Sequence, residues 1–418
     1  MPEDIQLSPT APRPGHVPSG AVYDFDFYAD PAMRKNPHDR VLEITRDAPP
    51  VFWTPRNGGH WIIRGHSAVF KASRQPELFT VEIVPYSEIQ AIKAKLKPGE
   101  AVPLVALPNS VDPPVHATFR TPLQGVFSPK SIMAMRDEIR ALAVELIETE
   151  RPRGNCEFMA AIAEPMPVTV FLKMFGLPVE RQGEYRALVK EHFSSPAYDA
   201  QGSQLRLRKV ADIMSETILE RRENPGKDII STLWQAEFFG KEATLSDLEN
   251  YCVMLFLAGL DTVMNGMGLG VCHLARNPGL QAKLRASPAL IADATEEIIR
   301  RYTFTLPVRF VTKNQTFEGL TMKKGEMVLM FLPAADLDPG EFPEPDAFDM
   351  ERANKAHIAF GTGPHRCLGS HLARVELQIL YEELLARLPE FRLDPEKPLR
   401  YHGGNVWGPD ELHLLWDS

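Results

Sequence analysis

One segment of the chain is long and apolar enough to cross a bilayer. Residues 251–275 read YCVMLFLAGLDTVMNGMGLGVCHLA, and a membrane span needs about 20 such residues. Three polar residues interrupt it: Asp261, Asn265 and His273. Polar groups inside a membrane are costly, and Ser246 followed by Glu249 has the capping-box spacing that marks a helix start in water. The sequence therefore predicts a long helix buried through the middle of a protein that does not cross a membrane.

The composition is that of an ordinary globular protein, with 44% hydrophobic and 24% charged residues. The 55 Asp and Glu residues outnumber the 46 Lys and Arg residues, which gives a net charge of -9. An acidic chain of this kind argues against sequence-independent binding to nucleic acid. The cysteines are too few and too scattered for a disulfide framework, which favours the reducing cytoplasm. They are Cys156, Cys252, Cys272 and Cys367.

The first 20 residues, MPEDIQLSPTAPRPGHVPSG, are rich in proline and lack the apolar stretch of a signal peptide or membrane anchor. We expect residues 1–20 to form a flexible arm. Residues 21–418 contain no recognisable linker and no internal repeat, so they are predicted to form a single domain.

Hydrophobic spacing predicts a fold that is mainly α with a smaller β portion. Apolar residues recur at helical spacing over residues 133–147, 205–219, 288–302 and 371–388. Strand-like runs occupy residues 50–53 and 60–63 on either side of an Asn-Gly-Gly turn. Residues 303–350 are rich in β-branched and turn-forming residues, and residues 401–416 again have the pattern of strands and turns.

A glycine-rich loop places a cysteine before the last long helix. Residues 360–369 read FGTGPHRCLG. The two glycines permit a tight turn, and a thiolate near a helix start is favoured by unpaired backbone N–H groups. Such a sulfur is suited to bind haem iron as an anionic axial ligand. A zinc site from His357, His365, Cys367 and His371 is the alternative, but its spacing matches no usual zinc pattern.

A second motif lies in the long apolar helix, where Ala258 and Gly259 precede Asp261 and Thr262. Small side chains let a planar cofactor lie against a helix, and the hydroxyl of Thr262 can bond back to the carbonyl of Ala258 and bend the helix. An acid and an alcohol next to bound dioxygen can deliver the protons that its reduction consumes. A core helix with a paired aspartate is the alternative interpretation.

A third motif is a glutamate–arginine pair, Glu297 and Arg300, whose three-residue spacing places both on one helical face. Glu296 and Arg301 are the alternative members of this pair.

With these motifs the chain resembles the cytochrome P-450 family over nearly its whole length. The family's loop F-G-x-G-x-H-x-C-x-G matches residues 360–369, and its oxygen-activating pattern A/G-G-x-D/E-T matches residues 258–262. The resemblance implies the cytochrome P-450 fold, a triangular prism with a long central helix and a haem-thiolate loop. It also implies haem b as cofactor, with no flavin or iron–sulfur cluster in this chain.

The resemblance assigns roles residue by residue. Cys367 would be the axial ligand, and Asp261 and Thr262 would be catalytic. The remaining haem contacts would be Phe360, Gly361, Gly369, Ala258 and Gly259, with His116, Arg120, Arg309 and His365 reaching the propionates. A buried structural trio would comprise Glu297, Arg300 and Arg352.

The resemblance further implies a monooxygenase that uses O2 and two electrons from a [2Fe–2S] ferredoxin with an NADH-dependent reductase. A local basic patch would meet the acidic ferredoxin. Its candidates are Arg120, Lys355, Arg366 and Arg374. A peroxide-driven enzyme and a non-catalytic haem- or terpenoid-binding protein are the alternatives.

Within the family the likeness is greatest to the camphor 5-monooxygenase group, which suggests a small cyclic terpenoid substrate. Leu104 falls where the camphor enzyme has a tyrosine that binds the ketone, so we expect a compact monoterpenoid such as 1,8-cineole rather than camphor. An ionone-type norisoprenoid is a further candidate. The predicted substrate pocket comprises Leu104, Leu107, Asn109, Met254, Leu257, Thr305, Val308, Asn405 and Val406.

Overall fold

The computed structural model describes residues 6–97, 103–193 and 200–417. Helices hold about 51% of the residues, which confirms the mainly α prediction. The chain divides into two compact units, each of which is described by itself. The first unit holds Met1–Val81, Arg140–Ala163 and Asn265–Ser418, and the second holds Glu82–Ile139 and Glu164–Met264. The predicted single domain over residues 21–418 stays a prediction.

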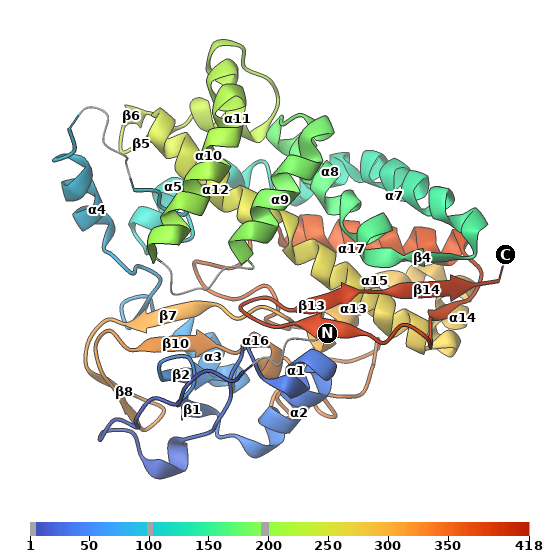
Figure 1. Cartoon of the computed structure of the whole chain (residues 1–418), viewed down its shortest axis with the longest axis horizontal. Helices are drawn as coiled ribbons and strands as arrows, with labels where there is room; N and C mark the ends of the chain where they lie inside the picture. Colours follow the sequence, from blue (N-terminus) through green and yellow to red (C-terminus); the bar gives the residue numbers. More distant parts are fainter. Residues whose placement is uncertain (1–5, 98–102, 194–199, 418) are drawn as a thin grey trace. The chain divides into compact units, whose positions relative to one another are not determined.

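The first unit contains helices at both ends of the sequence and most of the strands (Figure 1). Its helices are α1 (Pro31–Lys35), α2 (Pro37–Asp47), α3 (His66–Ala72), α14 (Pro278–Ala286), α15 (Ile291–Arg301), α16 (Leu332–Ala335) and α17 (Ser370–Arg387). Its strands are β1 (Val51–Thr54), β2 (His60–Ile63), β3 (Phe79–Thr80), β4 (Asn155–Glu157), β7 (Val308–Val311), β8 (Gln315–Phe317), β9 (Leu320–Met322), β10 (Met327–Met330), β11 (Phe391–Leu393), β12 (Arg400–His402), β13 (Gly408–Glu411) and β14 (His413–Trp416).

The second unit is largely helical. Its helices are α4 (Tyr86–Lys93), α5 (Val115–Gln124), α6 (Pro129–Ala134), α8 (Pro165–Phe175), α9 (Gln182–Phe193), α10 (Ala200–Glu223), α11 (Ile229–Trp234) and α12 (Leu245–Leu260), with the short strands β5 (Glu237–Phe238) and β6 (Lys241–Glu242). Two helices, α7 (Arg136–Glu150) and α13 (Thr262–Arg276), contain residues of both units.

The largest sheet joins segments from opposite ends of the sequence. Its strand order is β1-β2-β10-β7-β3, so the blue strands β1 and β2 lie beside the orange strands β10 and β7 (Figure 1). β1 and β2 form an antiparallel hairpin with Trp53 opposite Trp61, and β10 pairs with β2 in parallel. The hairpin turn at Asn57 and Gly58 has positive φ angles of 53° and 84°, which asparagine and glycine tolerate best. Both predicted strands are thus present.

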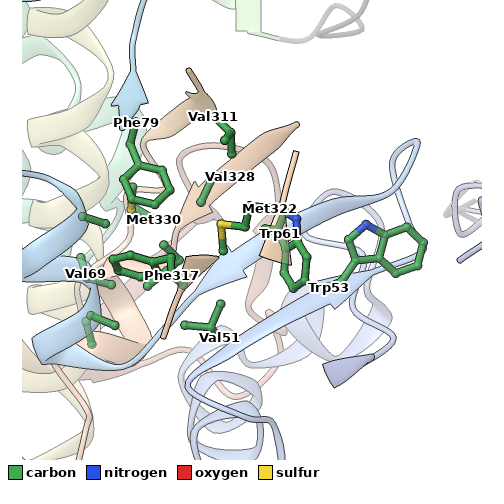
Figure 2. Close-up of a cluster of buried hydrophobic side chains, with 14 of the residues drawn as sticks. Val51, Trp53, Trp61, Val69, Phe79, Val311, Phe317, Met322, Val328 and Met330 are labelled. Atoms are coloured by element: carbon green, nitrogen blue, oxygen red, sulfur yellow. The ribbon is translucent and has the colours of Figure 1, made fainter. Parts of the chain in front are cut away.

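Side chains alternate between the two faces of a strand, and every residue of β1 and β2 is buried, so both faces of these strands are covered. On one face Val51, Trp53, Trp61, Val328 and Met330 belong to one buried cluster, which also contains Val69 of α3 (Figure 2). The other face is formed by the residues between them, including Phe52, Ile62 and Leu329, which pack with residues of α1 and α2. The sheet is therefore the centre of the first unit's core.

The segment predicted as a flexible arm contacts the first unit where the structure describes it. The backbone N–H of Ala11 donates to the carbonyl of Pro55 (2.8 Å), and Nε2 of His16 lies 2.8 Å from a carboxylate oxygen of Glu326. Val17 is fully buried in the same cluster as Trp53. The flexibility of residues 1–20 stays a prediction, but these contacts hold the residues that follow Ser8.

The long apolar helix begins and breaks at positions that differ in detail from the prediction. Its first part, α12, is capped by Thr244 and Asp247, each side chain bonding the other's backbone N–H. The predicted cap at Ser246 and Glu249 is wrong by two residues, because both pairs have capping-box spacing. Asp261 separates α12 from α13, so the predicted single helix is two helices in sequence. Residues Leu245–Arg276 pass a length and hydropathy test for a membrane span, a test that buried core helices also pass.

Candidate active site

The cysteine loop is shaped by its own backbone hydrogen bonds. The N–H of Cys367 donates to the carbonyl of Phe360 (2.8 Å), and the N–H of Gly361 donates to the carbonyl of Ile358 (2.8 Å). Gly361 and Gly363 have φ angles of 69° and 75°, a left-handed region that favours glycine. A Cβ on Gly363 would lie 2.5 Å from the carbonyl oxygen of Ser73, so a side chain there is also excluded by packing.

Cys367 differs from the other three cysteines in its surroundings. Cys367 is exposed, whereas Cys156, Cys252 and Cys272 are buried. Burial raises the pKa of the Cys156 thiol to about 12 and raises the pKa of Cys252 as well, so these two are poor thiolates at neutral pH. Cys367 lies three residues before the first residue of α17. Cys367 is thus the cysteine whose setting best suits a ligand.

The arrangement of the side chains does not support the alternative zinc site. No group of three or more His, Cys, Asp or Glu side chains among the described residues is arranged to hold a metal ion. His357, His365, Cys367 and His371 are all described, so this alternative is set aside.

The structure brings the predicted structural trio together below the surface. Arg300 donates from Nε and Nη2 to the two carboxylate oxygens of Glu297 (2.8 and 2.7 Å), and Nε and Nη2 of Arg352 lie 3.4 Å from one of them. The side chains of these three residues are 1–7% exposed. Arg352 also donates to the carbonyl of Pro343 (2.6 Å). The trio therefore anchors the irregular segment that precedes the cysteine loop.

Asp336 is a buried carboxylate that sequence analysis missed. It is fully buried, accepts hydrogen bonds from the backbone of Ile358 and the hydroxyl of Thr303 (both 2.7 Å), and its carbonyl accepts from Arg300 (2.7 Å). Burial raises the pKa of Asp336, opposed in part by the hydrogen bonds from Ile358 and Thr303. Asp336 thus links the trio to the start of the cysteine loop. In the sequence, the only indication of this role is that Asp336 is an acidic residue within a run of apolar residues.

The predicted propionate ligands lie in both units. In the first, Arg309 on β7 is 9% exposed and its Nη1 donates to the carbonyl of Val308 (2.8 Å), and His365 is half-buried in the cysteine loop. In the second, His116 and Arg120 are one turn apart on α5, so they share a helical face. His116 is 4% exposed.

The acid–alcohol pair lies at the junction of α12 and α13. The hydroxyl of Thr262 donates to the carbonyl of Ala258 (2.9 Å), and Asp261 is the C-cap residue that follows α12, with φ -94° and ψ -32°. Asp261 and Thr262 are half-buried and Ala258 is exposed. An exposed alanine on a mainly buried helix leaves room for a flat group on that face.

Gly259 has a packing reason of its own. A Cβ at Gly259 would lie 2.4 Å from two ring atoms of Phe171 on α8. The contact between α12 and α8 therefore requires glycine at this position. The sequence alone had suggested that glycine was needed there for contact with a planar cofactor. A haem contact at Gly259 stays a prediction.

The predicted pocket residues separate into two local groups. Leu104, Leu107 and Leu257 are buried in the second unit, Met254 is half-buried and Asn109 is exposed. In the first unit Thr305 pairs with Val406 in an antiparallel bridge, Val308 follows on β7, and Asn405 is exposed. A separate cavity of about 330 Å³ in the first unit is lined by other residues, including His38, His273, Arg276, Arg301 and Tyr302.

The predicted basic patch is partly neutralised by ion pairs. Lys355 pairs with Asp293 (2.6 Å), and Arg374 pairs with Glu296 through Nε and Nη2 (2.6 and 2.9 Å). Arg366 is exposed and Arg120 is half-buried. Two of the four predicted cations thus have carboxylate partners that come from α15, far away in the sequence.

The comparisons identify the family. The family model for cytochrome P450 matches residues 289–410. A probable cytochrome P450 127A1 from Sinorhizobium fredii is 33% identical over 97% of this chain and 97% of its own length. A steroid C26-monooxygenase from Mycobacterium tuberculosis is 30% identical over 92% and 94%, and a linalool 8-monooxygenase from Pseudomonas putida is 28% identical over 91% and 95%. The crystal structure of CYP101J2 superposes with a TM-score of 0.84 at 33% identity, covering 98% of this chain and 100% of that one.

This chain therefore belongs to the cytochrome P450 family, has its fold, and uses haem b. The residues of each unit fit that cofactor: an exposed cysteine follows a glycine turn in the first, and an exposed Ala258 lies beside Asp261 and Thr262 in the second. Cys367 would hold the iron, and haem supplies the activation of O2 for insertion into a C–H bond.

Proposed function

We propose that this P450 monooxygenase hydroxylates an unactivated C–H bond of a small cyclic terpenoid in the cytoplasm. One oxygen atom of O2 enters the substrate and the other leaves as water. Two electrons come from a [2Fe–2S] ferredoxin that an NADH-dependent reductase supplies. A compact monoterpenoid such as 1,8-cineole is favoured over camphor, and an ionone-type norisoprenoid is the other candidate.

The observation that carries this proposal is an apolar stripe that ends at the acid–alcohol pair. Met254, Leu257 and Ala258 of α12 and its C-cap residue Asp261 are spaced three, one and three residues apart, so they follow one helical face. An apolar substrate packed along this face would have its reacting carbon near Asp261 and Thr262, which hold and move protons. A small apolar molecule suits such a stripe, because it needs no charged partner.

The segment that contains Leu104 supports recognition by shape. The N–H of Leu104 donates to Oε1 of Gln204 (3.0 Å), and Nε2 of Gln204 donates back to its carbonyl (3.2 Å). The N–H of Val105 donates to Oδ1 of Asn250 (2.8 Å). These backbone groups are engaged within the second unit, so they do not offer a hydrogen bond to a substrate ketone. A molecule held mainly by packing is the better match.

Two polar residues of the first unit, Thr305 and Asn405, are the proposal's candidates for polar contacts. Thr305 forms an antiparallel bridge with Val406, and next to it the N–H of Leu306 donates to the carbonyl of Asn405 (2.9 Å). The bridge fixes the backbone and leaves the Asn405 side chain exposed. One amide and one hydroxyl are enough to orient a cyclic ether or alcohol.

The names of two relatives point to different substrate sizes. Linalool is a terpenoid, which supports the proposal, whereas a steroid is a much larger apolar substrate.

The purified ferric protein should be titrated with 1,8-cineole, camphor, β-ionone, a C12 fatty acid and a steroid, recording the loss of the iron's water ligand as a low-to-high-spin change. We expect the cyclic terpenoids to give the largest change. A spin change with fatty acid or steroid alone would overturn the substrate class.

The electron source needs its own test. Product should form with ferredoxin, its reductase, NADH and O2, and form much more slowly when hydrogen peroxide replaces them. Equal rates with peroxide would indicate a peroxide-driven enzyme, and spin changes without product under both conditions would indicate a binding protein.

A further inference from the structure

Glu296, which the sequence offered only as an alternative to Glu297 in the glutamate–arginine pair, lies at the centre of a second ion-pair cluster. Glu296 and Glu297 are consecutive on α15, so they point to different sides of the helix. Nε and Nη2 of Arg374 bind the carboxylate of Glu296 (2.6 and 2.9 Å), and Nε2 of His357 lies 3.2 Å from it. Burial opposes the charge on Glu296, but these hydrogen bonds lower its pKa to about 2. Glu296 is therefore a carboxylate at neutral pH.

His357 connects Glu296 to the first part of the cysteine loop. Its side chain is 2% exposed, and its Nδ1 accepts a hydrogen bond from the N–H of Ala359 (3.3 Å). Because Nδ1 accepts, the ring proton lies on Nε2 and points to Glu296. The next residue, Phe360, accepts the hydrogen bond from the N–H of Cys367 (2.8 Å).

Arg374 connects the same carboxylate to the other side of the loop. It lies on α17, and its Nη1 donates to the carbonyl of Ser370 (3.3 Å). Its guanidinium carbon lies 4.5 Å from the ring centroid of Phe360, within cation–π distance. Phe360 is therefore flanked by two side chains, His357 and Arg374, that are both tied to Glu296.

We infer that Glu296 is a positioning residue for Cys367: through His357 and Arg374 it fixes Phe360, whose carbonyl holds the N–H of the cysteine. The Glu297 trio binds the segment from Asp336 to Arg352, whereas the Glu296 cluster binds the loop itself and α17. Arg374 therefore serves the cysteine loop rather than the ferredoxin surface. A bidentate pair between arginine and carboxylate has the directional hydrogen bonds that such a role needs.

The experiment compares Glu296→Gln and Arg374→Gln with Arg387→Gln as a matched control. Arg387 is also on α17 and is also paired with glutamates, Glu383 and Glu148 (both 2.8 Å), but at the far end of the helix. The reduced, carbon monoxide-bound holoprotein is held in mild urea, and the decay of its thiolate-type Soret band is followed. We expect about tenfold faster decay in the two variants, since each loses a charge-assisted hydrogen bond, and wild-type decay in the control.

A second readout separates this role from partner binding. The KM for ferredoxin should change little in Glu296→Gln, and Arg374→Lys should decay at an intermediate rate because it keeps the charge but not the paired geometry. Arg374→Lys also serves if Glu296→Gln does not fold. Wild-type decay in the Glu296 and Arg374 variants, or a raised KM as the sole effect of Arg374→Gln, would overturn the inference.

Discussion

The hydroxyl of Thr262 donates a hydrogen bond of 2.9 Å to the carbonyl of Ala258, one turn back along α12. This bond lies where α12 ends and α13 begins, and a hydroxyl bonded to the carbonyl four residues back tends to bend a helix. It fixes the direction of the hydroxyl and places it next to Asp261. The backbone at the end of α12 therefore orients the hydroxyl of the proton-carrying pair, Asp261 and Thr262.

Replacing Thr262 with alanine should uncouple electron use from product formation. The variant loses the hydroxyl that moves protons, so NADH consumption should continue while product per NADH falls by about tenfold or more and hydrogen peroxide rises. Thr262→Ser keeps the hydroxyl and should stay close to wild type. Both ratios can be measured by oxygen electrode and product chromatography. Unchanged coupling in Thr262→Ala would contradict a proton role for this residue.

Gly259→Ala should destabilise the protein through its contact with Phe171. Alanine favours a helix over glycine by about 1 kcal/mol, but overpacking typically costs about 1–3 kcal/mol. A Cβ 2.4 Å from the Phe171 ring cannot fit without movement. Urea unfolding should show a net loss, and Phe171→Leu in the same chain should restore part of it.

The control for that substitution is Gly279→Ala in α14, where a Cβ would meet nothing within 4 Å. It should be neutral or stabilising by up to about 1 kcal/mol. Equal losses at both positions would rule out the Phe171 contact as the cause.

Glu297→Gln should be strongly destabilising. The substitution leaves Arg300, which is 1% exposed, and Arg352 without their shared carboxylate. Removing one partner of a buried ion pair typically costs about 3–5 kcal/mol. Thermal unfolding and haem content should both fall. Glu148→Gln removes the partly exposed pairs with Arg151 and Arg387, so it should cost much less than Glu297→Gln.

Glu376 should make stability depend on pH. It is 1% exposed on α17, and neither carboxylate oxygen has a hydrogen-bond partner among the described residues. Burial raises its pKa to about 8, so the folded state keeps its proton where the unfolded state, with a pKa near 4.5, loses it. Stability from this group is therefore lost as pH rises between these values.

Glu376→Gln has no proton to lose, so its Tm relative to wild type should rise between pH 5 and pH 8. Calorimetry at the two pH values measures this difference. A Tm difference that stays constant would mean that Glu376 is ionised in the folded protein.

Sequence patterns of short range were the most informative about this fold. Residues 50–53 and 60–63 were predicted as strands and form β1 and β2, because alternation and an Asn-Gly-Gly turn act over a few residues. The start of α12 was misplaced by two residues, because Thr244/Asp247 and Ser246/Glu249 have the same spacing. Spacing alone does not show which of the two residues, Thr244 or Ser246, is the N-cap.

Interactions between distant segments were beyond prediction. Lys355 and Arg374 were expected on a basic patch, yet their partners Asp293 and Glu296 are more than 60 residues away in the sequence. The packing of Phe171 against Gly259 was likewise invisible, since α8 and α12 are far apart in the chain. Glu297, Arg300 and Arg352 were found because the family resemblance supplied the long-range link.

The absorption spectrum of the reduced, carbon monoxide-bound protein tests the central claim most directly. Wild type should show the red-shifted Soret band of a thiolate-ligated haem, and Cys367→Ser and Cys367→His should lose it. A wild-type spectrum typical of nitrogen ligation, or a Cys367→Ser protein that keeps the thiolate band, would contradict the account.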